Sequence, residues 1–199
     1  MKVFTYLVVR LLFLRVISKK NFIIFDMKLF EATHTFFYNW SQVSVANWRK
    51  YPNANCPHVV AIDVLDRHVD PETGVLRTER LITCHQTIPG MLNRLCGGCT
   101  ISYAREVSEI DPQNKVLKMT SCNLSMNHLI NVTETVTYTE DPTNPSRTLF
   151  KQEARIKCGE SISRFAGYIE NFFIQRFRDN AALGRQGFEN VLMGQGEAA

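Results

Sequence analysis

Residues 161–180 read SISRFAGYIENFFIQRFRDN, and this stretch decides the fold. Its apolar side chains recur every three to four positions, which is the spacing of an α-helix buried along one side. Ser161 is expected to cap this helix, which continues past a weakening at Gly184 and Gly187. The sequence therefore predicts one long C-terminal helix that another element must cover. Its apolar stripe comprises Ile162, Phe165, Ile169, Phe173, Phe177, Phe188 and Val191.

Two polar side chains interrupt the apolar face of this helix. Arg176 and Asn180 lie within or beside the stripe, whereas Arg178 and Asp179 point away from it. A cation on an apolar face must be paired, hydrated or functional, because burying it alone is costly. Arg176 is therefore expected to turn toward the protein interior.

Seven short segments precede the helix and alternate between apolar and polar residues, as half-buried β-strands do. Turn residues separate them, most clearly Asp70-Pro71-Glu72-Thr73-Gly74 and Asp111-Pro112-Gln113-Asn114. This pattern predicts an antiparallel meander and an α+β fold, in which the sheet closes against the C-terminal helix around an apolar interior. The predicted strands cover residues 28–36, 59–68, 76–86, 101–110, 116–124, 130–139 and 149–156.

Two shorter helices are predicted between the strands. Asn39, with Gln42 three residues later, forms a capping box for a helix that runs through Lys50 and ends before Pro52. A second apolar helix lies between glycines within residues 87–98. It suits a mobile lid, and equally an ordinary connecting helix packed on the core. Its apolar side chains are Ile88, Met91, Leu92 and Leu95.

Composition indicates one globular domain without a nucleic-acid partner. The chain has 199 residues, of which 45% are hydrophobic and 21% charged. Its formal net charge is +4, but residues 1–26 contain five lysines and arginines against Asp26 alone. Residues 27–199 are therefore nearly neutral and lack the basic surface of a nucleic-acid binder.

Residues 1–26 are a segment apart. The apolar run within them is interrupted by Arg10 and Arg15 and is shorter than the ~20 residues of a membrane-spanning helix. Their basic, nearly acid-free composition is typical of a mitochondrial presequence. Alternatively, Met27 is the true start and residues 1–26 are a gene-model extension. Under either interpretation the domain covers residues 27–199.

Catalytic and metal-binding motifs are missing from the sequence. Cys96 and Cys99 are the only close pair of cysteines, and no second CxxC or paired histidines complete a zinc site. The chain has no GxSxG elbow, no glycine-rich phosphate loop and no HExxH helix. The sequence therefore favours a binding protein over an enzyme and predicts neither a cofactor nor a metal.

Eight collinear segments carry a more specific signal. In chain order they are MKLF at 27–30, ANWRKYPN at 46–53, HVVAIDVL at 58–65, TERLI at 78–82, REVS at 105–108, SCNL at 121–124, ETVTY at 134–138 and QRF at 175–177. Through them the chain resembles the PRELI/slowmo family of mitochondrial phospholipid-transfer proteins, from Met27 to the C-terminus.

The resemblance implies a helix-grip (START-like) fold, with a seven-stranded antiparallel sheet wrapped around the long C-terminal helix and a lid loop over a cavity. It also implies a carrier that moves phospholipid between the outer and inner mitochondrial membranes through the intermembrane space, without a covalent step. Such carriers bind a small partner protein with a twin-cysteine helical hairpin and touch the membrane surface transiently.

The resemblance also assigns lipid-binding residues. They are Lys50, His58, Arg80, Arg176 and Asn180, which fall on matching family positions. The alternative for the two arginines is an internal salt bridge, and the candidate partners are Glu79, Glu106, Glu134 and Glu153.

Three departures from the family bear on the lipid head group. The branch associated with phosphatidic acid has lysines where this chain has Cys84, Thr87 and Leu183. Fewer cations suit a head group other than a bare phosphate monoester, and the motifs are closer to the slowmo branch. The resemblance thus favours phosphatidylserine. Phosphatidic acid transfer, and a regulator that binds lipid without transferring it, remain alternatives.

Overall fold

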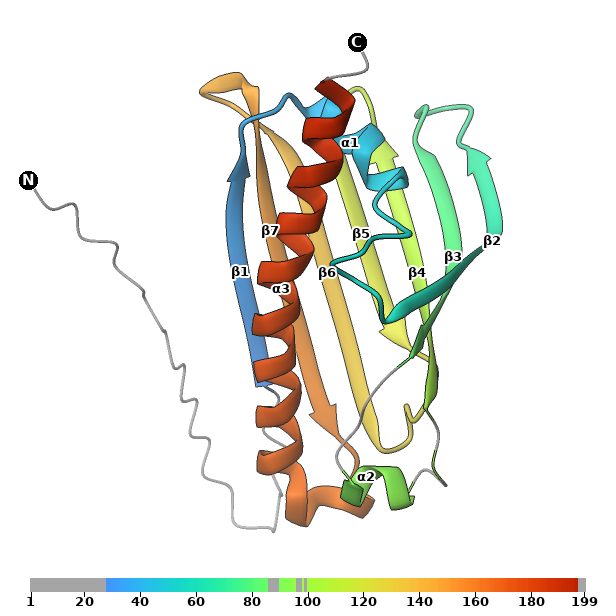
Figure 1. Ribbon diagram of the computed structural model, residues 1–199. Helices are drawn as coiled ribbons and strands as arrows, with labels where there is room; N and C mark the ends of the chain where they lie inside the picture. Colours follow the sequence, from blue (N-terminus) through green and yellow to red (C-terminus); the bar gives the residue numbers. More distant parts are fainter. Residues whose placement is uncertain (1–27, 86–89, 96–97, 99, 197–199) are drawn as a thin grey trace, which may run out of the picture.

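The computed structural model describes residues 28–85, 90–95, 98 and 100–196, so the predicted leader at 1–26 lies outside it. The described elements follow the predicted order along the chain (Figure 1). They are β1 (Lys28–Phe36), α1 (Trp40–Trp48), β2 (Val59–Val69), β3 (Leu76–His85), α2 (Gly90–Leu95), β4 (Ile101–Asp111), β5 (Val116–Asn123), β6 (Ile130–Asp141), β7 (Asn144–Cys158), the 3₁₀ helix η1 (Glu160–Phe165) and α3 (Ala166–Gly196).

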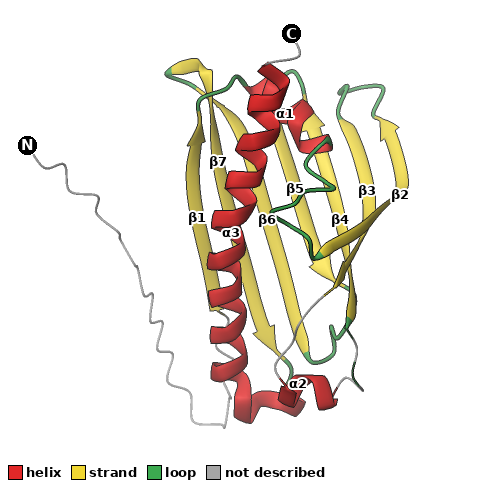
Figure 2. Cartoon of the chain, viewed as in Figure 1, coloured by secondary structure: helices red, strands yellow, loops and turns green. Residues whose placement is uncertain are grey.

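The strands form one seven-stranded antiparallel sheet in the order β1-β7-β6-β5-β4-β3-β2. Strands β2 to β7 are a meander, and β1 closes the other edge by pairing with β7. The sheet curves around α3, which runs along its inner face (Figure 2). This arrangement confirms the predicted α+β class and the helix-grip fold. None of the described helices combines the length with the sustained hydropathy that a membrane span requires.

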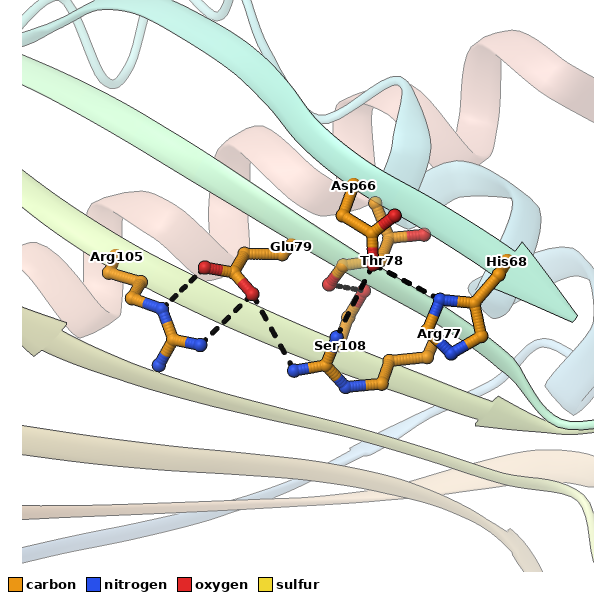
Figure 3. Close-up of polar contacts among 7 residues, drawn as sticks. All are labelled: Asp66, His68, Arg77, Thr78, Glu79, Arg105 and Ser108. Carbon is orange, nitrogen blue, oxygen red and sulfur yellow. Dashed lines mark hydrogen bonds and ion pairs between the residues drawn. The ribbon is translucent and has the colours of Figure 1, made fainter. Parts of the chain in front are cut away.

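Part of the outer face of the sheet is charged. A network of ion pairs on β2, β3 and β4 links Arg105 to Glu79, Glu79 to Arg77, Arg77 to Asp66, and Asp66 to His68 (Figure 3). Alternate strand residues point to opposite faces, and those on the inner face are apolar at both ends of the sheet.

The apolar core consists of two separate clusters on this inner face. Where α1 and the C-terminal half of α3 meet the sheet, the first cluster contains Phe36, Trp40, Tyr138 and Phe188. The second cluster lies where η1 and the N-terminal half of α3 meet the sheet, and contains Ile130, Ile156, Ile162 and Ile169. The space between the two clusters is available for a site.

The first helix follows its sequence signal closely. The Asn39 side chain accepts a hydrogen bond from the Gln42 backbone N–H at 2.9 Å, and the Gln42 side chain accepts one from the Asn39 N–H at 3.3 Å. The predicted capping box is confirmed. The helix ends at Trp48, before the predicted end at Lys50.

The connection between the strands predicted at 130–139 and 149–156 is shorter in the structure. Strand β6 continues to Asp141 and β7 starts at Asn144, because the Asp141 carboxylate accepts hydrogen bonds from the Thr143 N–H at 2.8 Å and its hydroxyl at 2.7 Å. Pro145 is tolerated in β7 because it lies beside the register shift at Glu140/Asp141.

The start of the C-terminal helix differs from the prediction. Ser161 does not cap it, because residues 160–165 form η1 and Gly159 is the N-cap, without a side-chain hydrogen bond. A 3₁₀ helix has three residues per turn, so it shifts the phase of the stripe. Phe165 is accordingly 45% exposed. Beyond it, α3 runs unbroken through Gly184 and Gly187.

The predicted short apolar helix is present as α2, at the same end of the sheet as the start of α3 (Figure 1). Ile88 lies outside the described residues, as do Cys96 and Cys99. The side chains of Met91, Leu92 and Leu95 are not described either, so the lid stays a prediction.

Candidate functional site

A cavity with two lobes lies between α3 and the inner face of the sheet, in the space between the two core clusters. The volumes are about 240 Å³ for the first lobe and 200 Å³ for the second. Together the lobes are within the range of small-molecule sites. The hollow interior expected from the sequence is therefore present. Both lobes are lined by Cys84, Ala104, Ser121, Glu134, Phe177 and Asn180.

Small residues on α3 leave room for the first lobe. Ala181 and Gly184 line it between the larger Phe177 and Phe188. A Cβ atom added to Gly184 would meet nothing within 4 Å. The glycine that weakened the helical pattern in the sequence thus borders open space instead of breaking the helix.

A row of polar residues crosses the floor of the cavity. In the strand register, Arg80 on β3 is opposite Glu106 on β4, Glu106 is opposite Ser121 on β5, and Ser121 is opposite Glu134 on β6. All four side chains line the first lobe. We call these four residues the polar row.

Arg80 and Glu106 form a buried ion pair within this row. The Arg80 Nε and Nη2 atoms donate to Glu106 Oε1 at 3.0 and 2.5 Å, and the two side chains are 6% and 12% exposed. The Arg80 guanidinium also lies 5.1 Å from the centre of the Trp48 ring. For Arg80, the structure contains the salt bridge that was the alternative to lipid binding; a direct lipid contact stays a prediction.

Glu134, at the other end of the row, is held by neutral groups. The Ser121 hydroxyl donates to Oε2 at 3.3 Å, and the Gln152 amide donates to Oε1 at 2.5 Å. Its place in both lobes puts this carboxylate where the lobes meet.

Lys50 brings a cation to the first lobe from the connection between α1 and β2. Burial lowers the pKa of Lys50, but Tyr51, Tyr138 and Glu134 act in the opposite direction, and the net pKa is above its ordinary value. Burial also raises the pKa of Tyr138 to about 12, against the opposing effect of Lys50. Lys50 is therefore an ammonium, and Tyr138 a neutral phenol, at neutral pH.

His58 and the two α3 residues complete the predicted set. Burial lowers the pKa of His58, and Arg176 and Lys50 lower it further, so the imidazole is neutral at neutral pH. Arg176 lines the second lobe, with its guanidinium 5.9 Å from the centre of the Phe172 ring. All five predicted lipid-binding residues thus line the cavity.

The departures from the family occupy different environments. Cys84 lines both lobes, so the cavity wall has a thiol at this position. Leu183 is 48% exposed on α3. Thr87 lies outside the described residues.

Sequence reasoning missed one cation and underrated two carboxylates. Arg185 lines the first lobe, and it follows the stripe residue Phe177 by eight positions, or about two helical turns. That spacing would have identified it. Glu106 and Glu134 were considered only as salt-bridge partners. The described residues contain no group of three or more potential metal ligands.

Two solved structures share the fold at low sequence identity. The Zhui aromatase/cyclase from a Streptomyces species aligns with a TM-score of 0.54 and 12% identity, over 86% of this chain and 94% of its own. Ara h 8.0201 aligns with a TM-score of 0.52 and 11% identity, over 84% of this chain and 99% of its own. At these identities the likeness concerns the helix-grip fold alone.

Curated relatives are much closer in sequence. The protein "UPS2, mitochondrial" from Saccharomyces cerevisiae is 46% identical over 83% of this chain and 73% of its own length. "UPS-like protein C36.10" from Schizosaccharomyces pombe is 43% identical over 83% and 89%. The "slowmo homolog" from Dictyostelium discoideum is 36% identical over 84% and 72%. With the sequence model of the PRELI-like family matching residues 41–198, the chain belongs to that family.

Proposed function

We propose that this protein is a phospholipid carrier that moves phosphatidylserine between the outer and inner mitochondrial membranes, through the intermembrane space. The observation that carries the proposal is the cavity, whose two lobes combine apolar side chains with the cations Lys50 and Arg176. Family membership and the mitochondrial name of the yeast relative support the role and the compartment.

The apolar side chains of the cavity shield part of the acyl chains from water. Each methylene exposed to water costs ~0.8 kcal/mol, so two chains of roughly fourteen methylenes would cost about 20 kcal/mol. Ile130, Val132 and Phe173 line the second lobe and supply the apolar surface for these chains. Carrying the lipid needs no covalent step, and we therefore propose that the protein is not an enzyme.

The cations of the cavity hold the head group. Lys50 lines the first lobe, Arg176 lines the second, and Asn180 lines both. A phosphate among them receives charge-assisted hydrogen bonds in a poorly hydrated site. Arg80 lines the same lobe as Lys50 while paired with Glu106, and it is proposed to contact the head group as well.

Entry and release require contact with a membrane and an opening. We propose that the segment with Ile88, Met91, Leu92 and Leu95 is the lid, since α2 lies at one end of the sheet (Figure 2). A small twin-cysteine helical-hairpin protein is the proposed partner during transit.

A liposome assay with labelled phosphatidylserine and the partner protein present tests this function. Arg176→Glu should abolish transfer without unfolding the domain, because it places a carboxylate beside the lipid phosphate. Arg178→Glu is the matched control, since Arg178 is exposed on the same helix. Normal transfer by Arg176→Glu would limit this arginine to a structural role.

Phosphatidic acid is the second candidate cargo, and the cation count of the cavity favours it. Lys50, Arg80, Arg176 and Arg185 line the lobes, against the two carboxylates Glu106 and Glu134. The same assay with phosphatidic acid decides between the cargoes. Lipid binding without transfer of either lipid would instead support a non-transferring regulator.

A further inference from the structure

Two opposite charges face the first lobe without forming an ion pair with each other. Lys50 and Glu134 both line it, and the Glu134 charge acts on the Lys50 ammonium. Among the ion pairs of the described residues, none joins Lys50 to a carboxylate and none includes Glu134. The lobe therefore contains an ammonium and a carboxylate that are not paired with each other.

Two buried charges with a purely structural role would be expected to be in direct contact with each other. Burying two charges is costly, and close contact with complete hydrogen bonding is what offsets that cost. Arg80 and Glu106 follow this rule on the same cavity floor, with contacts of 2.5 and 3.0 Å. Lys50 and Glu134 do not follow it: no ion pair joins them although both line the first lobe, so a ligand in that lobe can contact both charges.

The polar row explains why Glu134 stays in place. Ser121 and Gln152 fix its two oxygens through neutral donors. Each carboxylate oxygen can accept more than one hydrogen bond, so this anchoring leaves acceptor capacity for a further donor. The nearest register neighbour on β7 is Ala154, which is too small to cover the carboxylate.

From this geometry we infer that Glu134 recognises the ammonium group of an amine-bearing phospholipid, while Lys50 contacts the anionic part of the same head group. This inference rests on the proposed function and adds a basis for its head-group specificity. A head group with ammonium and phosphate can pair with both Glu134 and Lys50. Phosphatidic acid can pair only with Lys50 and leaves Glu134 facing a phosphate of like charge.

The first test uses the wild-type chain and changes only the lipid. Transfer between liposomes is compared for phosphatidylserine and for N-acetyl-phosphatidylserine, which keeps the phosphate and carboxylate but has no ammonium. We expect transfer of the acetylated lipid to fall about tenfold, the size of one charge-assisted hydrogen bond. Equal transfer of the two lipids would overturn the inference, whatever the behaviour of any variant.

The second test changes the protein. Glu134→Gln is expected to lose its preference for phosphatidylserine over the acetylated lipid and to transfer phosphatidic acid at least as well as the wild type. Glu153→Gln is the matched control, since Glu153 lies one strand away and pairs with Lys151. Circular dichroism checks folding. Should Glu134→Gln not fold, Glu134→Asp takes its place, and its shorter carboxylate should reduce the preference in part.

The outcomes separate the inference from the function on which it rests. If the wild type transfers no phospholipid, the proposed function fails. If it transfers lipid and Glu134→Gln keeps the wild-type preference, only the role of Glu134 fails.

Discussion

Arg80 on β3 and Glu106 on β4 form a buried ion pair on the inner face of the sheet. The ion pair of Arg105 and Glu79, on the outer face of the same two strands, is more exposed to solvent. Glu106→Gln should cost about 3 kcal/mol in the free energy of unfolding, because it leaves the Arg80 guanidinium, only 6% exposed in its side chain, without a counter-charge. Urea denaturation followed by circular dichroism measures this loss.

Glu79→Gln is the matched control, since Glu79 pairs with Arg105 on the outer face of the same two strands (Figure 3). Breaking this solvent-screened pair should lower the free energy of unfolding only slightly. The double variant Arg80→Met/Glu106→Leu should regain most of the stability, because it removes both charges together. Equal losses in the two single variants would contradict a special role for the buried pair.

His58 should make stability depend on pH. Its pKa in the folded protein lies below the ordinary value of 6.5, because of burial and of Arg176 and Lys50 nearby. As the pH falls below about 6.5, the unfolded chain therefore takes up the proton first, and stability falls until the pH reaches the folded pKa. Above that window the group has no effect. Urea midpoints at neutral and mildly acidic pH measure the loss.

The variant His58→Gln should reduce this acid-dependent loss. An unchanged pH dependence in His58→Gln would show that other groups dominate.

At the residue scale, the sequence identified cations better than it identified their partners. The apolar stripe predicted that Arg176 turns inward, because a cation on an apolar face stands out. Nothing in a single strand marks Glu134 or Glu106, because a strand with one solvated face contains carboxylates at many positions. Only the register across four strands brings the polar row together, and register is a property of the whole sheet.

At the scale of elements, two glycines of α3 have different surroundings and should respond differently to the same change. Gly184→Ala should stabilise the protein by up to about 1 kcal/mol, since alanine favours a helix and its Cβ meets nothing within 4 Å. At Gly187 the added Cβ would lie 2.6 Å from Asn53 Nδ2. Asn53 also accepts a hydrogen bond from the Asn55 N–H at 2.9 Å, so moving it offsets the helical gain. Thermal unfolding compares the two variants.

The control for this prediction is the Asn53→Ala background, in which Gly187→Ala should become stabilising. Equal gains at both glycines in the wild-type background would mean that the contact between Asn53 and α3 is unimportant.

Strand β1 and the capped helix α1 were the most predictable elements. Strand β1 has the predicted bounds, and the capping box at Asn39 and Gln42 is present, because both depend on neighbouring residues. The 3₁₀ helix η1 was not predicted. Its sequence fits the α-helical spacing of the residues that follow, and only the exposed Phe165 reveals the change of phase.

The molecule as a whole has a divided core. A solid interior would join the two apolar clusters, whereas here they are separated by the cavity and the polar row. Such a molecule gives up part of its apolar packing, since the atoms lining a void lack contacts on one side. A bound ligand restores those contacts, so stability and cargo are thermodynamically linked.

This linkage gives a prediction for the whole protein. Lipid at a hundred times its dissociation constant adds about 2.7 kcal/mol, which for a domain of this size raises the Tm by roughly 5–10 °C. Ala181→Leu should remove this increase, because its side chain enters the first lobe and takes the place of the head group. The lipid-free variant should be at least as stable as the wild type, since leucine fills empty space.

Ala182→Leu is the matched control: it makes the same change one residue along α3, at an exposed position, with the same effect on helix propensity. It should keep the full lipid-dependent rise in Tm. The measurement is thermal unfolding of lipid-free and lipid-loaded samples of all three proteins. If Ala181→Leu keeps the rise in Tm, the lipid binds outside the cavity. If both leucine variants lose the rise, lipid binding depends on the exposed surface of α3 and not on its side toward the cavity.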